Sequence, residues 1–135
     1  MYEELINFFK TMELYNEDYF NKIKVNTKTI DLPYEEIKDF VGCYKKDNEE
    51  FKLILPKLTD YYSMLIYIHE YTHCLFLDDE EEIFPNLMEA IFINKYIKDR
   101  KTIIEKTKEE ILKSTSEKHL IGKKVKLKAI EKYTK

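Results

Sequence analysis

The chain has 135 residues, which is the length of one domain, and we expect a single small domain over residues 1–135. Its 44% hydrophobic and 36% charged residues exclude a disordered chain, and its net charge of −3 argues against nucleic acid as a partner. No apolar run approaches the ~18 residues that span a bilayer, and the acidic first four residues are unlike a secretory signal, so we expect a cytoplasmic protein with no membrane partner.

The first half of the chain predicts helix followed by a small sheet. Apolar residues recur at helical spacing from Leu5 to Ile23, which predicts one amphipathic helix over residues 2–23 that backs the domain. Residues 25–31 alternate as a short strand does, and Pro33 is expected to open a helical turn over residues 34–40. Residues 41–44 and 51–55 predict two further strands joined by a turn. The fold class is therefore α+β with a small antiparallel or mixed sheet.

A helix is expected next, because no Gly or Pro interrupts residues 58–77 and Thr59 or Asp60 can cap its start. It contains the run His69-Glu70-Tyr71-Thr72-His73. Positions i and i+4 lie on one helix face, so His69 and His73 can offer two imidazoles to one Zn²⁺. Glu70 would stand beside that ion and take a proton from water. The alternative is a pair of hydrogen-bonded core histidines.

The last third predicts helices with a basic end. An acidic loop, residues 78–82, precedes a helix that carries apolar residues from Leu87 to Ile97 and is expected to continue beyond Arg100. Residues 103–113 repeat that pattern, and Gly122 is expected to break the chain before a weak tail element over residues 125–130. Residues 113–135 hold eight Lys against two Glu. This segment is either a solvated end or a surface that docks on the acidic loop.

A catalytic zinc site needs a third protein ligand. Cys74 lies about 100° around the helix from His73, which excludes it, and His119 is expected at the surface. Glu89 lies in an apolar stretch, where a carboxylate is costly to bury unless a positive charge accompanies it, and zinc would supply that charge. Glu82 is the second choice for this role, and its acidic neighbours predict a solvated side chain. The other interpretation of Glu89 is a capping or pairing role at the edge of its helix.

The strand at Phe51–Leu55, the helix with His69-Glu70-Tyr71-Thr72-His73 and the helix with Met88-Glu89-Ala90-Ile91 together resemble the gluzincin metallopeptidases, above all the single-domain minigluzincins. The resemblance covers about residues 42–94. It implies that His69, His73 and Glu89 bind one zinc per chain and that Glu70 is the general base. It also implies that strand 51–55 is an edge strand, which receives a peptide or protein substrate in an extended conformation.

Two features of the sequence depart from the family pattern. The gap between His73 and Glu89 is shorter than is common, and Ile93 stands where some gluzincins carry an Asp that supports the first His. Asp60 or a backbone carbonyl would then supply that support.

The functional expectation is a monomeric zinc metallopeptidase. Because the minimal gluzincins are known as zymogens, residues 113–135 are a candidate pro-segment that covers the site. Two alternatives stay open: a non-catalytic zinc-containing binding or assembly module, and a regulatory protease specific for one cytoplasmic partner.

Overall fold

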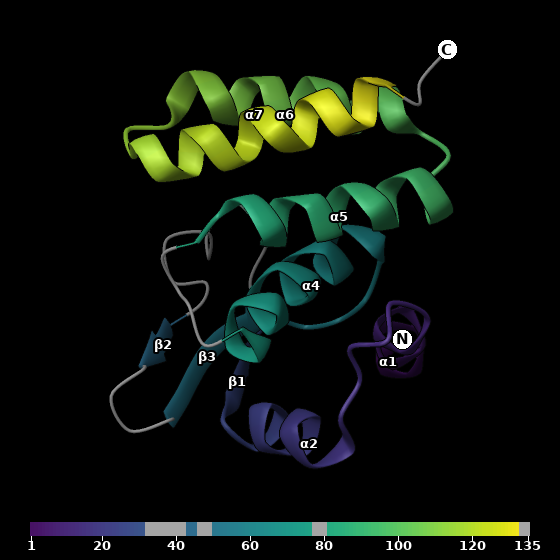
Figure 1. The fold of residues 1–135 in the computed structure, drawn as a ribbon, viewed down its shortest axis with the longest axis vertical. Coiled ribbons are helices and arrows are strands. Elements are labelled where there is room, and N and C mark those ends of the chain that lie inside the picture. Colours follow the sequence, from purple (N-terminus) through teal and green to yellow (C-terminus); the bar gives the residue numbers. More distant parts are fainter. Residues whose placement is uncertain (32–42, 46–49, 77–80, 133–135) are drawn as a thin grey trace. The chain divides into compact units, whose positions relative to one another are not determined.

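A computed structural model describes residues 1–31, 43–45, 50–76 and 81–132 (Figure 1). The chain forms two compact units, Met1–Asp79 and Glu80–Lys135. The expectation of a single domain stays a prediction. None of the helices in the described ranges combines the length and the apolar character that crossing a membrane requires.

Two helices replace the single N-terminal helix that the sequence predicted. Helix α1 covers Tyr2–Thr11 and α2 covers Glu17–Val25. The chain turns between them at Glu13, whose φ of 58° lies in the left-handed region. The side chain of Asn16 then caps α2 by accepting a 3.0 Å hydrogen bond from the backbone N–H of Tyr19. The apolar spacing continues because both helices bury one face, with Leu5, Phe8, Phe9, Phe20 and Ile23 in the core.

The first unit also holds a mixed three-stranded sheet in the order β1-β3-β2. Strand β1 (Thr27–Ile30) pairs parallel with β3 (Glu50–Pro56), and β2 (Cys43–Lys45) pairs antiparallel with β3. A wholly antiparallel sheet is therefore wrong, and so is the expectation that residues 51–55 form an edge strand. Strand β3 is central because it has a hydrogen-bonded neighbour on each side. The helical turn expected over residues 34–40 lies outside the described residues.

Helix α4 (Tyr61–Leu75) lies against β3, α1 and α2. The buried apolar side chains of β3 and α4 include Leu53, Leu55, Met64, Ile68 and Tyr71. The ring of Tyr71 contacts Phe9 of α1 and Phe20 of α2. Each such side chain contributes on the order of 1.5–3 kcal/mol when fully buried. The Tyr67 hydroxyl donates a 2.7 Å hydrogen bond to the carbonyl of Pro56, which ties the helix to the end of β3.

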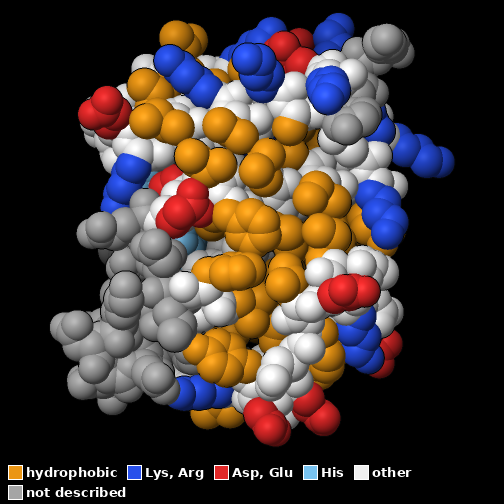
Figure 2. Space-filling model, in the orientation of Figure 1, with side chains coloured by type: hydrophobic (Ala, Val, Ile, Leu, Met, Phe, Trp, Pro, Cys, Tyr) orange, Lys and Arg blue, Asp and Glu red, His pale blue; other side chains and the backbone are white. Residues whose placement is uncertain are grey.

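The second unit consists of three helices, α5 (Ile83–Tyr96), α6 (Arg100–Lys113) and α7 (Glu117–Lys132) (Figure 1). Helix α5 ends before Arg100 rather than beyond it, because Asp99 caps a new helix by accepting from the backbone N–H of Thr102. Contacts between α5 and α7 advance together along both helices, from Glu82 with His119 to Glu89 with Lys126, so these two helices are parallel. In Figure 2, Lys and Arg side chains lie over the outside of α6 and α7.

Gly122 lies inside α7 instead of breaking it, and it is buried. A Cβ atom at this position would lie 2.5 Å from Asn86 Nδ2 and 2.7 Å from the carbonyl oxygen of Glu82. The glycine is therefore explained by the close approach of α7 to the start of α5, rather than by a turn. The expectations of a weak tail element and of a solvated C-terminal end are both wrong, since Gly122, Lys126 and Ile130 are buried on one face of α7.

Candidate metal site

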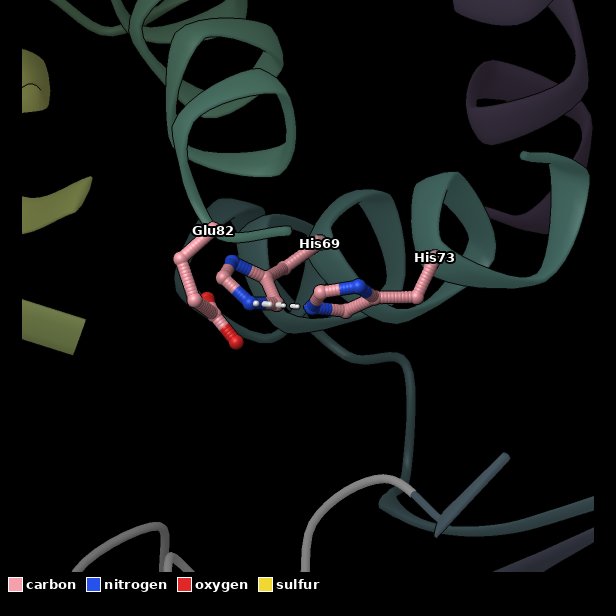
Figure 3. A group of neighbouring side chains, drawn as sticks. All are labelled: His69, His73 and Glu82. Carbon is pink, nitrogen blue, oxygen red and sulfur yellow. Dashed lines mark hydrogen bonds between the residues drawn. The ribbon is translucent and has the colours of Figure 1, made fainter. Parts of the chain in front are cut away.

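The two histidines of the predicted motif meet on α4. Their Nε2 atoms are 3.1 Å apart, and their rings lie 4.8 Å apart between centroids (Figure 3). His73 is buried and His69 is half-buried. The short distance between the nitrogens requires that one imidazole donates to the other, or that both face a shared cation. Two Zn–N bonds at a tetrahedral angle place the nitrogens about 3.3 Å apart. The His pair therefore fits a zinc ion.

Local sequence places the pair on a well-anchored helix. Asp60 and Ser63 form a capping box, in which Ser63 N donates to Asp60 Oδ1 at 2.8 Å and Asp60 N donates to Ser63 Oγ at 3.1 Å. His69 lies nine positions after Asp60, which is about 13.5 Å along a helix. Asp60 is thus the cap and does not support the first His.

Glu70 is half-buried and follows His69 directly, so it projects to a different side of α4. Cys74, one turn later, is a buried free thiol. Burial, with a smaller contribution from the negative charge of Glu70, raises the pKa of this thiol well above its usual range. The thiol therefore stays protonated, which supports the prediction that Cys74 is a small buried hydrophobic residue rather than a ligand.

Glu89 on α5 is buried, and its positive partner is a side chain of the same unit. Lys126 Nζ lies 3.1 Å from Glu89 Oε1, and each side chain is only 9% exposed. Burial acts to lower the pKa of Lys126, but Glu89 and Glu110 outweigh it, so this pKa is raised and the ammonium stays charged. The charge that sequence reasoning assigned to zinc is thus available from Lys126. One signal was present in the sequence: Gly122, Lys126 and Ile130 follow at four-residue spacing.

Glu82, the second choice for a ligand, is not solvated. Its side chain is 4% exposed, and its Oε1 lies 3.2 Å from Nε2 of His119, which is 45% exposed. The capping of α5 falls instead to Glu81, whose two carboxylate oxygens accept from the backbone N–H groups of Ile83 and Phe84 at 2.8 and 2.9 Å. Glu82 occupies the N-cap position of α5, but its side chain makes no capping hydrogen bond.

The histidines belong to the first compact unit, and the two candidate carboxylates, Glu82 and Glu89, belong to the second. The pair of donors that the first unit supplies by itself is therefore His69 and His73, two imidazole nitrogens of the kind that Zn²⁺ accepts.

Comparisons of this chain with protein-family models, with curated proteins and with solved structures find no match.

Proposed function

We propose that this chain binds one zinc ion through His69 and His73 and hydrolyses peptide bonds as a metallopeptidase. The observation that supports the proposal most directly is the 3.1 Å separation of the two Nε2 atoms on α4. Two imidazoles at the spacing of zinc ligands, with a carboxylate at the residue between them on the helix, form the donor pair and base of zinc hydrolases that carry His-Glu-x-x-His.

Two carboxylates of the second unit are the candidates for a third ligand, Glu89 as the first choice of the sequence and Glu82 as the second, and both are buried. Glu89 is the weaker choice, because zinc would have to compete for it with the buried ammonium of Lys126 at 3.1 Å. The earlier assignment of Glu89 remains a prediction that the same experiment tests.

Zinc bound at this site would act as a Lewis acid towards a peptide carbonyl and would lower the pKa of a nearby water. The protein residue that moves protons in this scheme is Glu70. Its carboxylate accepts a proton from the attacking water and later donates it to the leaving amine nitrogen. To hold the ion, His69 and His73 would both have to present unprotonated Nε2 atoms and give up the contact that now joins these atoms.

An extended substrate would have to pair with an outer strand, since β3 has neighbours on both sides. Among the described strands these are β1 and β2. This differs from the substrate strand that the resemblance implied.

The test is zinc content measured on protein purified without added metal. We expect about one zinc per chain, lost in His69→Ala and His73→Ala, and the zinc content of Glu82→Ala and of Glu89→Gln then identifies the carboxylate ligand. Glu70→Gln should keep zinc and fold, while hydrolysis of casein falls by the ~10²–10⁴-fold typical of a lost acid–base group. Undiminished hydrolysis by Glu70→Gln would overturn the mechanism, and loss of zinc in Glu89→Gln alone would restore Glu89 as the ligand.

A second candidate function is a zinc-containing binding or assembly module without catalysis. The central position of β3 favours it, because the strand expected to receive substrate is already paired. Full zinc occupancy without cleavage of casein or of proteins in a cell lysate would select this function. Cleavage of one lysate protein alone would instead indicate a regulatory protease.

Latency remains a prediction as well. Helix α7 buries Gly122, Lys126 and Ile130 within the second unit, so removal of residues 113–135 would uncover the core of that unit. Point substitutions on exposed positions of α7, such as Lys118 and Lys124, are therefore a better test of a pro-segment than truncation.

A further inference from the structure

The two compact units differ in charge, which the total for the chain conceals. The second unit, Glu80–Lys135, holds 14 Lys and Arg against 10 Asp and Glu, whereas the first unit, Met1–Asp79, holds 9 against 16. Their net charges are therefore +4 and −7, which together give the −3 of the whole chain. A negative total thus does not exclude an anionic partner for the second unit.

Positive charge is concentrated on the exposed side of α7. Residues 118, 121, 125, 128 and 132 follow one another at steps of three and four, so they line one face of the helix, and Lys124 lies beside them. All are exposed except Val125, which is partly exposed. Glu117 and Glu131 border this face, and Glu131 lies 3.8 Å from Lys108 Nζ of α6. Figure 2 shows hydrophobic and Lys side chains intermixed over α6 and α7. We call this surface the basic face of α7, and it consists of Lys118, Ile121, Lys124, Val125, Lys128 and Lys132.

Interactions within the unit explain only part of this face. In the described part of the chain no ion pair involves Lys118, Lys124 or Lys128, whereas the two lysines on other sides of α7 each have one. Lys124 and Lys128 are four positions apart, as are Lys128 and Lys132, and like charges at that spacing on a helix repel each other. The helix dipole favours cations only in the last turn, so it accounts for Lys132 but not for Lys118 or Lys124. A partner outside the unit would account for them.

The composition of the face indicates a lipid surface rather than nucleic acid. Ile121 is 46% exposed and lies between Lys118 and Lys124. An isoleucine gains little from a phosphate backbone, but at a membrane surface it can be buried where the headgroups meet the acyl chains. Arg100, the single Arg of the sequence, donates to the backbone carbonyl of Asn94 at 2.7 Å. The face therefore offers lysine point charges, which attract anionic headgroups, and no arginine fork that could read a guanine edge.

We propose that the basic face of α7 binds the surface of a membrane that contains anionic phospholipid. Its lysines would lie against the headgroups, and Ile121 would enter the boundary with the acyl chains. The opposite face of α7 stays buried in its own unit through Gly122, Lys126 and Ile130, so the helix would lie on the membrane without crossing it. The proposal goes beyond the zinc site and does not depend on it.

The experiment measures binding of the full chain to vesicles of phosphatidylcholine, either alone or with about a third of phosphatidylserine. We expect binding only to the vesicles with phosphatidylserine, and weaker binding as salt is raised. Each lysine near an anionic surface contributes about fivefold to the partition constant, so the combined variant Lys118→Gln, Lys124→Gln and Lys128→Gln should bind about 100-fold more weakly. Ile121→Gln should bind about fivefold more weakly, because roughly half of this side chain is available for burial.

The matched control removes three exposed lysines from the first unit, through Lys10→Gln, Lys22→Gln and Lys28→Gln. It has the same net charge as the test variant, so wild-type binding in the control would show that the face, rather than the total charge, is responsible. Circular dichroism checks that each variant is folded.

Three results would overturn the proposal. The first is a wild-type chain that binds neither kind of vesicle, or both equally. The second is a control variant that loses as much binding as the test variant. The third is tighter binding to a DNA or RNA duplex than to the vesicles at the same salt, lost in the test variant, which would assign the face to nucleic acid. Zinc content is a separate measurement, so each of these results leaves the proposed metal site untouched.

Discussion

Replacement of Gly122 by Ala should destabilise the second unit, although the same replacement inside a helix usually stabilises it. Alanine normally gains about 1 kcal/mol over glycine in a helix interior. Here the new methyl group would lie 2.5 Å from Asn86 Nδ2 and 2.7 Å from the Glu82 carbonyl oxygen. Favourable carbon contacts begin near ~3.5 Å, so about 1 Å of movement is needed.

The neighbouring atoms have no inexpensive way to move. The Asn86 amide can rotate away, but it then loses its 2.7 Å hydrogen bond to Glu82, which is worth about 1 kcal/mol. The carbonyl oxygen belongs to the backbone, so the two helices must also separate, at about 1–3 kcal/mol for an overpacked core. Subtracting the helix gain of about 1 kcal/mol leaves a net loss of roughly 1–3 kcal/mol.

The assay is urea unfolding of the full chain, combined with segment-resolved hydrogen exchange, because two compact units can unfold separately. Lys124 supplies the control: it is exposed on the same helix, so the difference between Lys124→Ala and Lys124→Gly measures the ordinary preference of α7 for alanine. We expect alanine to be favoured at 124 and disfavoured at 122. Greater protection of α5 and α7 in Gly122→Ala would refute the close-approach explanation. Adding Asn86→Ala to Gly122→Ala removes one of the two colliding groups and should recover part of the lost stability. The recovery should be incomplete because the Glu82 carbonyl oxygen still collides with the new methyl group.

Three further predictions concern the ion pair, the buried tyrosine and the helix cap. Lys126→Met should cost about 3–5 kcal/mol because it leaves the Glu89 carboxylate buried without its ammonium, and Lys126→Met with Glu89→Leu should recover most of that in urea unfolding; no recovery would argue against a simple pair. Burial, with a smaller contribution from Tyr2, raises the pKa of Tyr67 to about 12, so the unfolded chain loses this proton first and stability should fall from pH 10 to pH 12. Tyr67→Phe should flatten that part of the stability profile, and an unchanged slope would assign it to other groups. Asp60→Ala should cost about 0.5–2 kcal/mol and speed amide exchange in the first turn of α4, whereas unchanged exchange would show that the capping box is dispensable.

Elements whose signals are local could be predicted from the sequence. Helix α4 was expected because its sequence lacks Gly and Pro and begins at a capping residue, and Asp60 is indeed the cap. The pairing of His69 with His73 follows from helical spacing alone.

Features that depend on distant contacts could not be predicted in this way. The break between α1 and α2 is hidden because both helices continue the same apolar spacing. In the sequence Gly122 has the appearance of a helix breaker, and only its contact with the start of α5 explains why it is a glycine. The burial of Glu82 depends on His119 and Gly122, which are more than 35 positions away in the chain. The positive charge that Glu89 requires was anticipated, but its source on α7 was not.

The contacts between the parallel helices α5 and α7 favour the observed alignment over one in which α7 is shifted by seven residues. Suppose that α7 slid by one heptad. Ala129 would then occupy the place of Gly122, and its methyl group would collide with the start of α5 as described above. Lys126 would face Glu82 and leave Glu89 buried without its cation. Sliding the other way would bring Thr115, which precedes α7, to the same place. Gly122, the Glu89–Lys126 ion pair and the contact between Glu82 and His119 therefore each disfavour a shifted alignment of the two helices.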